Sequence, residues 1–408
     1  MSNGYSGGSK QIIIVGNGNA GLSAAKAART QDPEARIIMF GEDNRLPYYR
    51  LRLCNYIGKS ADFNGLEISD EEWFDKNRIQ VELSSKVTAI DTGAKKIVAN
   101  NKEYYYDSLV LATGSKPIMP PFKGKELSGI HTLWTWEDIV SINKSLRDAK
   151  KAVVIGGGLL GLEAAHKISE MGIHVTLIEG MPRLLPKQLD EEGSEIFKAK
   201  VESLGISVIC GISVAGFEGD SNGNVKKVYM ADDTVLDADA VIVAVGVAPN
   251  TSIFKDSGFS INRFVIVNEK METSIKDVYA AGDVACVNGR WFGQWSVAGR
   301  QGQVAGTNAA GGNAVYKITD VPYILATMGT RVVCSGDTSN AQSEGSNETC
   351  ETDRKFDKVQ FSYSKLVFRN GLFVGYMLVG EPAKYFNKLQ SMLQTDAGAE
   401  TINNILYN

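Results

Sequence analysis

The sequence lacks several features that define common protein classes. Its five cysteines are scattered and form neither a Cys-x-x-Cys nor a Cys-x4-Cys pair. This excludes a local redox dithiol and leaves no ligand set for zinc or an iron–sulfur cluster, so we expect no bound metal. No apolar run approaches the length of a membrane span. The net charge of -4 argues against nucleic acid or an anionic membrane as the main partner.

The first ten residues, MSNGYSGGSK, lack the apolar core of a secretory signal peptide. We therefore expect residues 1–10 to be a flexible N-terminus and the cytoplasm to be the location. The length of 408 residues allows two or three domains.

A glycine motif near the N-terminus organises the chain. An apolar strand over residues 12–15 runs into Gly16-x-Gly18-x-x-Gly21, and an alanine-rich helix follows over residues 22–29. Gly16 allows the tight turn, Gly18 lets a pyrophosphate approach the backbone, and Gly21 lets the helix pack closely on the strand. A plain glycine-rich turn is the alternative, but the strand–turn–helix context favours a dinucleotide site.

The same pattern occurs a second time. An apolar strand over residues 152–155 leads into a glycine-rich turn that contains Gly156, Gly158 and Gly161, and a helix follows from Leu162. Two dinucleotides on one chain suggest an electron relay, with a flavin in one site and a nicotinamide in the other.

Each motif is followed by a second strand that ends near a carboxylate. Glu42 comes just after the strand over residues 36–40, and Glu179 directly follows the strand over residues 174–178. A carboxylate at this position can accept hydrogen bonds from ribose hydroxyls and would repel a 2′-phosphate. We therefore expect NADH rather than NADPH in the second site, a preference that Arg183 weakens slightly.

Four further segments carry groups that suit a flavin nucleotide. Arg50 lies in a loop rich in aromatic residues and can neutralise a pyrophosphate. Gly114 ends a buried strand and permits close approach to the backbone. Asp283 follows Gly282 at another strand end, where its carboxylate can accept a hydrogen bond from ribitol. The helix over residues 295–310 can direct its N-terminal amides at the charge of a reduced flavin.

The order of these segments predicts an α/β protein with two Rossmann-like domains and a small α+β domain at the C-terminal end. Prolines after residue 116 and near residue 249 mark the linkers. The predicted domains are an FAD-binding domain over residues 11–116 and 248–318, an NADH-binding domain over 117–247, and a C-terminal domain over 319–408. A strong hairpin around Asn370-Gly371 supports the last of these.

The sequence resembles the two-dinucleotide flavoproteins of the pyridine nucleotide-disulfide oxidoreductase superfamily. The shared motifs are the two glycine turns, Ala112-Thr113-Gly114, Gly161-Leu162-Glu163, Val245-Gly246-Val247-Ala248-Pro249-Asn250 and Ala280-Ala281-Gly282-Asp283. Three more are similar to NADH:rubredoxin reductases and to the flavin portion of NADH-dependent nitrite reductases: Pro47-Tyr48-Tyr49-Arg50, Leu185-Pro186-Lys187-Gln188-Leu189-Asp190, and Phe368-Arg369-Asn370-Gly371 with the glycines that follow.

The resemblance implies FAD and NADH as cofactors and electron transfer to a rubredoxin- or ferredoxin-like carrier or to a partner reductase subunit, and it allows a homodimer. It places Glu163 beside the nicotinamide as the catalytic residue. The residues expected to bind FAD are Gly16, Gly18, Gly21, Glu42, Arg50, Thr113, Gly114, Asp283, Trp295 and Ala298. The residues expected to bind NADH are Gly156, Gly158, Gly161, Glu179 and Gly246.

Two alternatives stay open. NADH oxidases, NADH peroxidases and CoA-disulfide reductases carry a redox cysteine where this chain has Leu51, and Cys54 is three residues away. A thiol enzyme that uses Cys54 is therefore one alternative, although an inert buried thiol is the favoured interpretation. The other is an NADH-sensing flavoprotein subunit of a nitrite-reductase-type assembly, since the chain stops before the iron–sulfur and siroheme portions of such an enzyme.

Overall fold

The computed structural model describes residues 9–59, 62–254, 257–339 and 349–407. Most of the N-terminal segment predicted to be flexible, residues 1–8, lies outside the described residues. The chain folds into two compact units, each built from three separate segments. The first comprises Met1–Arg52, Asp62–Lys116 and Val247–Ile318, and the second comprises Leu53–Ala61, Pro117–Gly246 and Thr319–Asn408.

The first unit contains a parallel sheet in the order β19-β7-β1-β2-β3. Its strands are β1 (Gln11–Val15), β2 (Arg36–Phe40), β3 (Ile79–Glu82), β7 (Ser108–Leu111) and β19 (Val278–Ala280). The central strands are almost wholly apolar and buried, as strands covered on both faces must be. Because all five strands are parallel, their carboxyl ends meet at one edge, where ligands bind in open α/β sheets.

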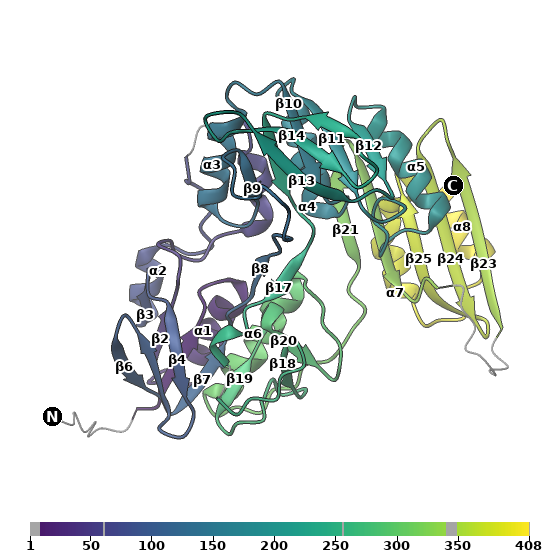
Figure 1. Cartoon of the computed structure of the whole chain (residues 1–408). Helices are drawn as coiled ribbons and strands as arrows, with labels where there is room; N and C mark the ends of the chain where they lie inside the picture. Colours follow the sequence, from purple (N-terminus) through teal and green to yellow (C-terminus); the bar gives the residue numbers. More distant parts are fainter. Residues whose placement is uncertain (1–8, 60–61, 255–256, 340–348, 408) are drawn as a thin grey trace. The chain divides into compact units, whose positions relative to one another are not determined.

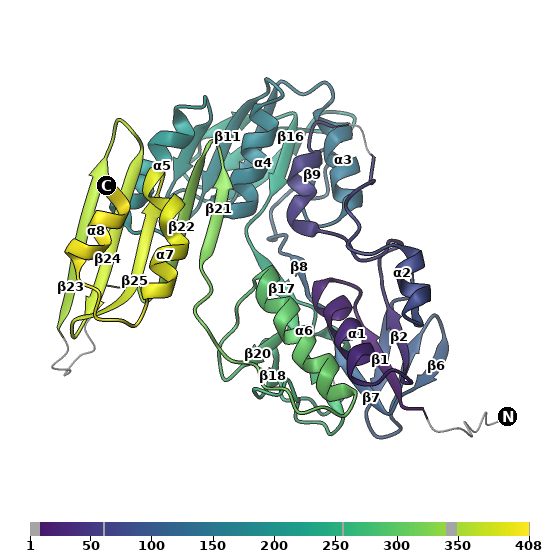
Figure 2. The same cartoon turned by 180° about the vertical axis from the view of Figure 1, so that it is seen from behind.

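Helices α1 (Asn19–Gln31) and α6 (Trp295–Ala309) lie side by side in this unit (Figures 1 and 2). Their contact is made by small residues. A Cβ atom added to Gly302 would overlap the carbonyl oxygen of Ala20, and one added to Gly306 would overlap that of Ala24. The two helix backbones therefore approach closely, and this brings both helix N-termini to the same part of the unit.

Smaller elements complete the first unit. They are an antiparallel sheet of β4 (Val87–Asp91), β5 (Lys96–Ala99) and β6 (Lys102–Tyr105), a pair of β18 (Val265–Val267) and β20 (Ala285–Val287), helix α2 (Glu71–Lys76), and the 3-10 helices η2 (Ser252–Phe254) and η3 (Gly282–Val284). The 3-10 helix η1 (Arg50–Tyr56) contains the point at which the chain first leaves this unit. The chain leaves this unit a second time at strand β8 (Ser115–Pro117) and returns to it at strand β17 (Val247–Pro249). These two strands pair with each other.

The second unit repeats the parallel arrangement, in the order β12-β11-β10-β16-β9. The strands are β9 (Ile130–Thr132), β10 (Lys151–Ile155), β11 (His174–Glu179), β12 (Ser207–Cys210) and β16 (Ala240–Val243), accompanied by α3 (Trp136–Leu146), α4 (Leu159–Ser169) and α5 (Glu191–Glu202). One face of the sheet packs on the antiparallel strands β13 (Val214–Gly219), β14 (Val225–Met230) and β15 (Val235–Asp237) through a shared apolar core.

The C-terminal part of this unit is an antiparallel sheet in the order β21-β22-β25-β24-β23. It consists of β21 (Tyr323–Thr327), β22 (Thr330–Gly336), β23 (Cys350–Asp357), β24 (Ser362–Arg369) and β25 (Leu372–Val379), followed by η4 (Glu381–Tyr385), α7 (Phe386–Met392) and α8 (Ala399–Tyr407). Asn370 and Gly371 both have positive φ, as the two-residue turn of a tight hairpin requires. Residues 362–368 are all buried, because α5 packs on β24 and β25 while α7 and α8 share an apolar core with this sheet.

Candidate nucleotide-binding sites

The first glycine turn has the geometry of a phosphate cradle. Gly16 has φ +113° and donates its N–H to Phe40 O at 2.8 Å, which ties the turn to β2. A Cβ atom added to Gly21 would overlap the carbonyl oxygen of Gly16, so only glycine fits there. A Cβ atom added to Gly18 would meet nothing within 4 Å. No side chain caps helix α1, so the backbone N–H groups of its first turn are available to an anion.

Asp283 is a partly buried acid in η3, just after the end of β19. Its Oδ2 accepts a hydrogen bond from Ser115 Oγ at 2.6 Å. Burial raises the pKa of the Asp283 carboxyl, while the Ser115 hydrogen bond and the charge of Arg50 act in the opposite direction. The structure therefore brings together Arg50 and Asp283, two of the residues predicted to bind FAD. Arg50 also lies 3.9 Å from Asp43, on the loop after β2.

Thr113 and Gly114 lie where the chain leaves the parallel sheet. Thr113 Oγ1 donates to Asn250 O at 3.0 Å, and Asn250 Nδ2 donates back to Thr113 O at 2.9 Å. Gly114 has φ +64°, and a Cβ atom there would meet nothing within 4 Å. Thr113 thus fastens the outgoing segment to the returning segment. Gly114 accepts the N–H of Asn250 at 2.9 Å and leaves open space where a side chain would stand.

The N-terminus of α6 carries a buried polar atom that lacks a partner. Among the described residues, Gln294 Oε1 is a buried side-chain oxygen without a hydrogen-bond partner, and no side chain caps the helix. Asn19 Nδ2 donates to Trp295 O at 2.6 Å, which links the starts of α1 and α6. Ala298 lies against Gly282, beside Asp283. A nucleotide with polar edges fits these groups, because it would supply the hydrogen bond that Gln294 lacks.

Glu42 occupies a more exposed position than the other predicted FAD ligands. Its carboxylate is 69% exposed and pairs with Lys86 Nζ at 2.5 Å. Its ribose role stays a prediction. The neighbouring Asp43 is turned inward instead: it accepts from Tyr48 Oη at 3.1 Å and its side chain is 10% exposed.

The second glycine turn repeats the first. Gly156 has φ +116° and donates to Ile178 O at 2.7 Å, and a Cβ atom on Gly161 would overlap the oxygen of Gly156. Gly158 and Gly246 leave open space where a side chain would stand, and Gly246 has φ +103°. Helix α4 again starts without a side-chain cap. The backbone geometry of the first glycine turn therefore recurs in the second unit.

Glu179 lies beside this turn. Its Oε2 accepts the N–H of Gly157 at 2.7 Å, and its Oε1 accepts that of Met181 at 2.8 Å. Arg183 directs its guanidinium to the carbonyl oxygens of Leu189 and Pro186. The carboxylate of Glu179 is thus held at the turn, whereas Arg183 forms hydrogen bonds with the loop that follows β11. This arrangement favours a free 2′-hydroxyl over a 2′-phosphate.

Glu163, in the first turns of α4, forms a hydrogen bond with the side chain of Cys54. Burial raises the pKa of Glu163, and the Cys54 bond and the charge of Lys167 oppose this. Cys54 is 4% exposed, and burial, followed by the charge of Glu163, raises the pKa of its thiol well above the usual value. The thiol is therefore protonated near neutral pH and is a poor nucleophile.

Sequence reasoning missed several of these partners. Ser115 and Gln294 were not expected to contribute, and Asn250 was noted only as the last residue of a shared motif. The contacts of Ser115 and Asn250 could not be foreseen, because their partners Asp283 and Thr113 are distant in the chain. Tyr323 was missed for the same reason: the charge of Glu163 is among the causes that raise its pKa to about 12, after burial and Cys334.

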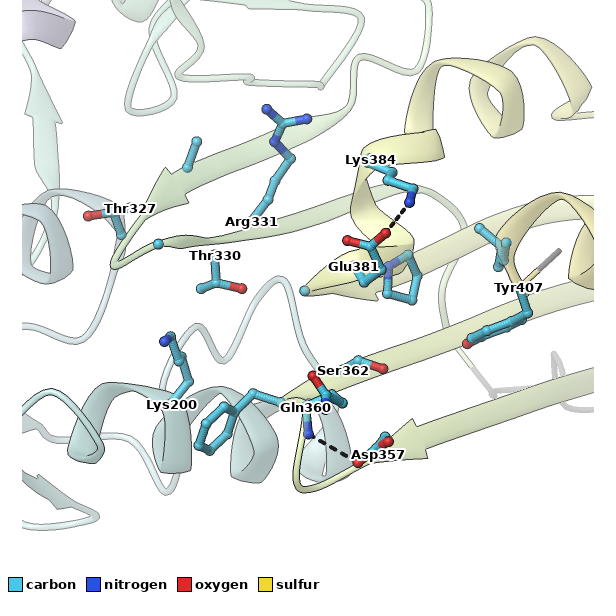
Figure 3. A pocket seen from close by; sticks show the side chains of 16 residues that line it. Lys200, Thr327, Thr330, Arg331, Asp357, Gln360, Ser362, Glu381, Lys384 and Tyr407 are labelled. Atoms are coloured by element: carbon cyan, nitrogen blue, oxygen red, sulfur yellow. Dashed lines mark hydrogen bonds and ion pairs between the residues drawn. The ribbon is translucent and has the colours of Figure 1, made fainter.

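A cavity of about 870 Å³ lies elsewhere in the second unit, between the end of α5 and the C-terminal sheet (Figure 3). Its lining includes Lys200, Thr330, Gln360 and Glu381, the last paired with Lys384. None of the residues predicted to bind FAD or NADH lines it. Across the described ranges, no cluster of three metal-ligating side chains is present, and no helix is long and apolar enough to cross a membrane.

Comparisons with known proteins agree with this geometry. Nitrite reductase (NAD(P)H) of Bacillus subtilis (strain 168) is 31% identical over 393 residues, which cover 96% of this chain and 48% of that protein. NADH-rubredoxin oxidoreductase of Clostridium acetobutylicum is 35% identical over 333 residues, which cover 81% of this chain and 83% of that protein. The chain thus spans about half the length of the nitrite reductase that it matches.

Structural comparison gives the same result. The NAD-dependent persulfide reductase from A. fulgidus matches with a TM-score of 0.86 and 29% identity, over 97% of this chain and 78% of that one. A family model for pyridine nucleotide-disulphide oxidoreductases matches residues 10–302. These matches confirm the predicted fold class, with two Rossmann-like domains, and the predicted FAD and NADH cofactors. A nucleotide cradle in each unit and a family match over most of the chain lead to one conclusion: the chain belongs to the pyridine nucleotide-disulphide oxidoreductase family.

Proposed function

We propose that this protein passes electrons from NADH through FAD to a small redox protein of the rubredoxin or ferredoxin type. The observation that carries the proposal is the repeated glycine turn, with open space at Gly18 in one unit and at Gly158 in the other. The 35% identity to an NADH-rubredoxin oxidoreductase over 83% of that protein supports a small carrier as the acceptor.

Bound FAD supplies the step between a two-electron donor and a one-electron acceptor, and the protein supplies binding and electrostatics. In the first unit, the open turn and uncapped N-terminus of α1 bind the pyrophosphate, with Arg50 adding positive charge. Asp283 accepts a hydrogen bond from the polyol, held in place by Ser115. The N-terminus of α6, with Trp295 and Ala298 in its first turn, stabilises negative charge at the flavin.

In the second unit, Gly156, Gly158 and Gly161 form the NADH phosphate site, and Gly246 leaves room beside it. Glu179 accepts the ribose hydroxyls. Glu163 contacts the nicotinamide end, and burial, opposed by the hydrogen bond from Cys54 and the charge of Lys167, raises the pKa of its carboxyl.

The five free cysteines suit a reducing compartment, and we propose the cytoplasm. We also propose a homodimer, and the molecular mass of the purified protein in solution would test it.

The test uses purified protein loaded with FAD and mixed rapidly with NADH or NADPH. We expect NADH to bleach the flavin absorbance and NADPH to do so at least about tenfold more slowly, because Glu179 would repel a 2′-phosphate. Rubredoxin, ferredoxin and CoA disulfide are then supplied as acceptors. Turnover with a carrier protein supports the proposal, and turnover with the disulfide alone would contradict it.

Cys54→Ser separates this function from the thiol alternative. We expect the variant to retain carrier reduction, since the buried, protonated thiol does not attack a substrate. Complete loss of turnover in a variant that still holds FAD would instead identify a thiol enzyme.

A second candidate function is that of a flavoprotein subunit in a nitrite-reductase-type assembly. The match to the B. subtilis nitrite reductase covers 96% of this chain, including the C-terminal domain. Reduction by NADH without turnover of any small carrier would favour this role.

A further inference from the structure

The loop over residues 180–190 follows β11 and lies directly on the second glycine turn. Leu185 N donates to Gly157 O at 3.1 Å. Leu184 Cδ2 lies 2.6 Å from the place where a Cβ atom of Gly157 would stand, so the loop and the turn are in tight contact. Leu184 and Leu185 are fully buried. A displacement of this loop would therefore be transmitted to the turn.

The loop ends at Asp190, which is the N-cap of α5. Asp190 Oδ1 accepts the N–H of Gly193 at 3.1 Å, as an N-cap side chain does. Ser194 Oγ, one residue further into the helix, donates to Leu184 O at 2.9 Å. The start of α5 is thus joined to the loop at two points, Asp190 and Leu184.

Two side chains of the C-terminal sheet hold the other oxygen of Asp190. Tyr363 Oη donates to Asp190 Oδ2 at 2.8 Å, and Lys365 Nζ lies 3.2 Å from the same atom. Residues 363 and 365 are two apart on β24, so they point to the same face, on which α5 packs (Figure 1). Lys365 also donates to Thr338 O at 3.0 Å.

Lys365 is 2% exposed, and lysine is almost never this buried unless it is paired. Its partner Asp190 is 23% exposed. The ring of Tyr363 lies 2.9 Å from the position that a Cβ atom of Gly193 would take, so the sheet also fits closely against the helix start. Burial, followed by the hydrogen bond to Asp190, raises the pKa of Tyr363, so this hydroxyl stays a donor.

We propose that Lys365 is a positioning residue for NADH: its ion pair with Asp190 fixes the 180–190 loop, and the loop fixes the Gly157 turn that would hold the pyrophosphate. The proposal rests on the proposed function, in which that turn binds NADH. It assigns to the C-terminal domain a part in nucleotide binding, although no residue of that domain was predicted to contact either cofactor.

The test compares wild type, Lys365→Met and the matched control Lys358→Met, which makes the same change at an exposed lysine on the adjacent turn. Two quantities are measured on the FAD-loaded protein: the dissociation constant of NADH, and deuterium exchange of the backbone over residues 180–190. We expect Lys365→Met to weaken NADH binding by about tenfold and to speed exchange in the loop, because a displaced turn would lose about one hydrogen bond to the pyrophosphate. The limiting rate of flavin reduction at saturating NADH should change by less than about twofold, since the lost contact positions the nucleotide and does not touch it. Lys358→Met should match wild type in every measurement.

A double variant tests whether the effect passes through Asp190. In an Asp190→Asn background, Lys365→Met should cause no further weakening of NADH binding, since residues that act as one pair are non-additive. NADH affinity within about twofold of wild type in Lys365→Met would overturn the proposal, whether or not loop exchange changes. Equal losses in both backgrounds would also overturn it. Failure of wild type to bind NADH would refute the proposed function, and loop exchange in Lys365→Met would then decide on its own whether Lys365 holds the loop.

Discussion

At the scale of single residues, the main result is a contrast between two kinds of carboxylate. Glu179 accepts hydrogen bonds from the backbone N–H groups of Gly157 and Met181. Glu163 and Asp283 are partly buried, and the loss of solvent around them raises the pKa of both. Acids whose pKa is raised by burial are typical of functional sites.

The raised pKa of Glu163 predicts a pH-dependent stability effect. The folded protein binds this proton more tightly than the unfolded chain, whose ordinary pKa is 4.5. The stability contributed by Glu163 is therefore complete below that pH and is lost as pH rises through the folded pKa. Glu163→Gln cannot ionise and therefore does not lose this stability as the pH rises. The melting temperature of the variant, relative to that of wild type, should therefore increase with pH above about 4.5.

Glu170→Gln, at the C-cap of the same helix, is the matched control. Glu170 is exposed, and its hydrogen bond to Lys167 lowers its pKa. The melting-temperature difference should therefore move in the opposite direction with pH, and only slightly, because solvent screens the pair. A difference for Glu163→Gln that stays constant between about pH 4 and pH 8 would show that this carboxyl is not perturbed.

The residue scale also shows where sequence reasoning stops. The glycine turns could be predicted because all their requirements lie within one strand, one turn and one helix. The contacts of Asp283 with Ser115 and of Lys365 with Asp190 could not, because the partners are far apart in the chain and meet only through the tertiary fold. Glu42 was chosen from its place after β2, but the sequence does not reveal its pairing with Lys86.

At the scale of elements, the two strand–turn–helix units have the same internal contacts, so each glycine can be assigned one task. Gly21 and Gly161 allow the helix to pack on the turn, and Gly18 and Gly158 leave the outer face open. The strands of the C-terminal sheet were harder to delimit. The hairpin was predicted from its Asn370-Gly371 turn, but the start of β24 at Ser362 has no apolar signal, because its first residues are buried serine, tyrosine and lysine side chains.

Gly18→Ala and Gly21→Ala should therefore have different effects. The first adds a methyl group in open space, so the fold should be retained, but FAD binding should weaken because the pyrophosphate would approach that face. The second forces a methyl group onto the carbonyl of Gly16 and should destabilise the first unit by about 1–3 kcal/mol or more. Retained FAD after gel filtration and the urea midpoint measure the two effects. Equal stability of the two variants would contradict the assignment.

At the scale of the whole molecule, the sequence predicted the α/β class and the succession of segments correctly, because hydrophobic patterns and glycine turns are local signals. It also predicted a C-terminal domain over residues 319–408, and these domain bounds stay a prediction. In the structure these residues belong to the same compact unit as the 117–246 segment, and the packing of α5 on β24 and β25 explains why. This packing depends on pairs such as Lys365 with Asp190, which no periodicity reveals. The assignment of each predicted domain to a cofactor stays a prediction.

The free thiols give a test that applies to the complete protein. All five cysteines are free, with Cys54 and Cys286 buried. We expect five thiols to be titrated in denaturant with or without prior reduction, and the melting temperature to be the same with and without dithiothreitol. The native protein should react more slowly at the two buried positions, because the thiolate must be both formed and reached. A thiol count that rises after reduction would contradict this.

The discontinuous first unit has a consequence for synthesis on the ribosome. Strand β19 and helix α6 come from the last third of the chain, yet β19 pairs with β7 and α6 packs on α1. The parallel sheet of the second unit, by contrast, is complete once residue 243 has been made. The N-terminal strands must therefore wait for their final partners, while a segment translated after them can already close its own sheet. Nascent chains released shortly after residue 243 should accordingly protect the later sheet from protease before the earlier one.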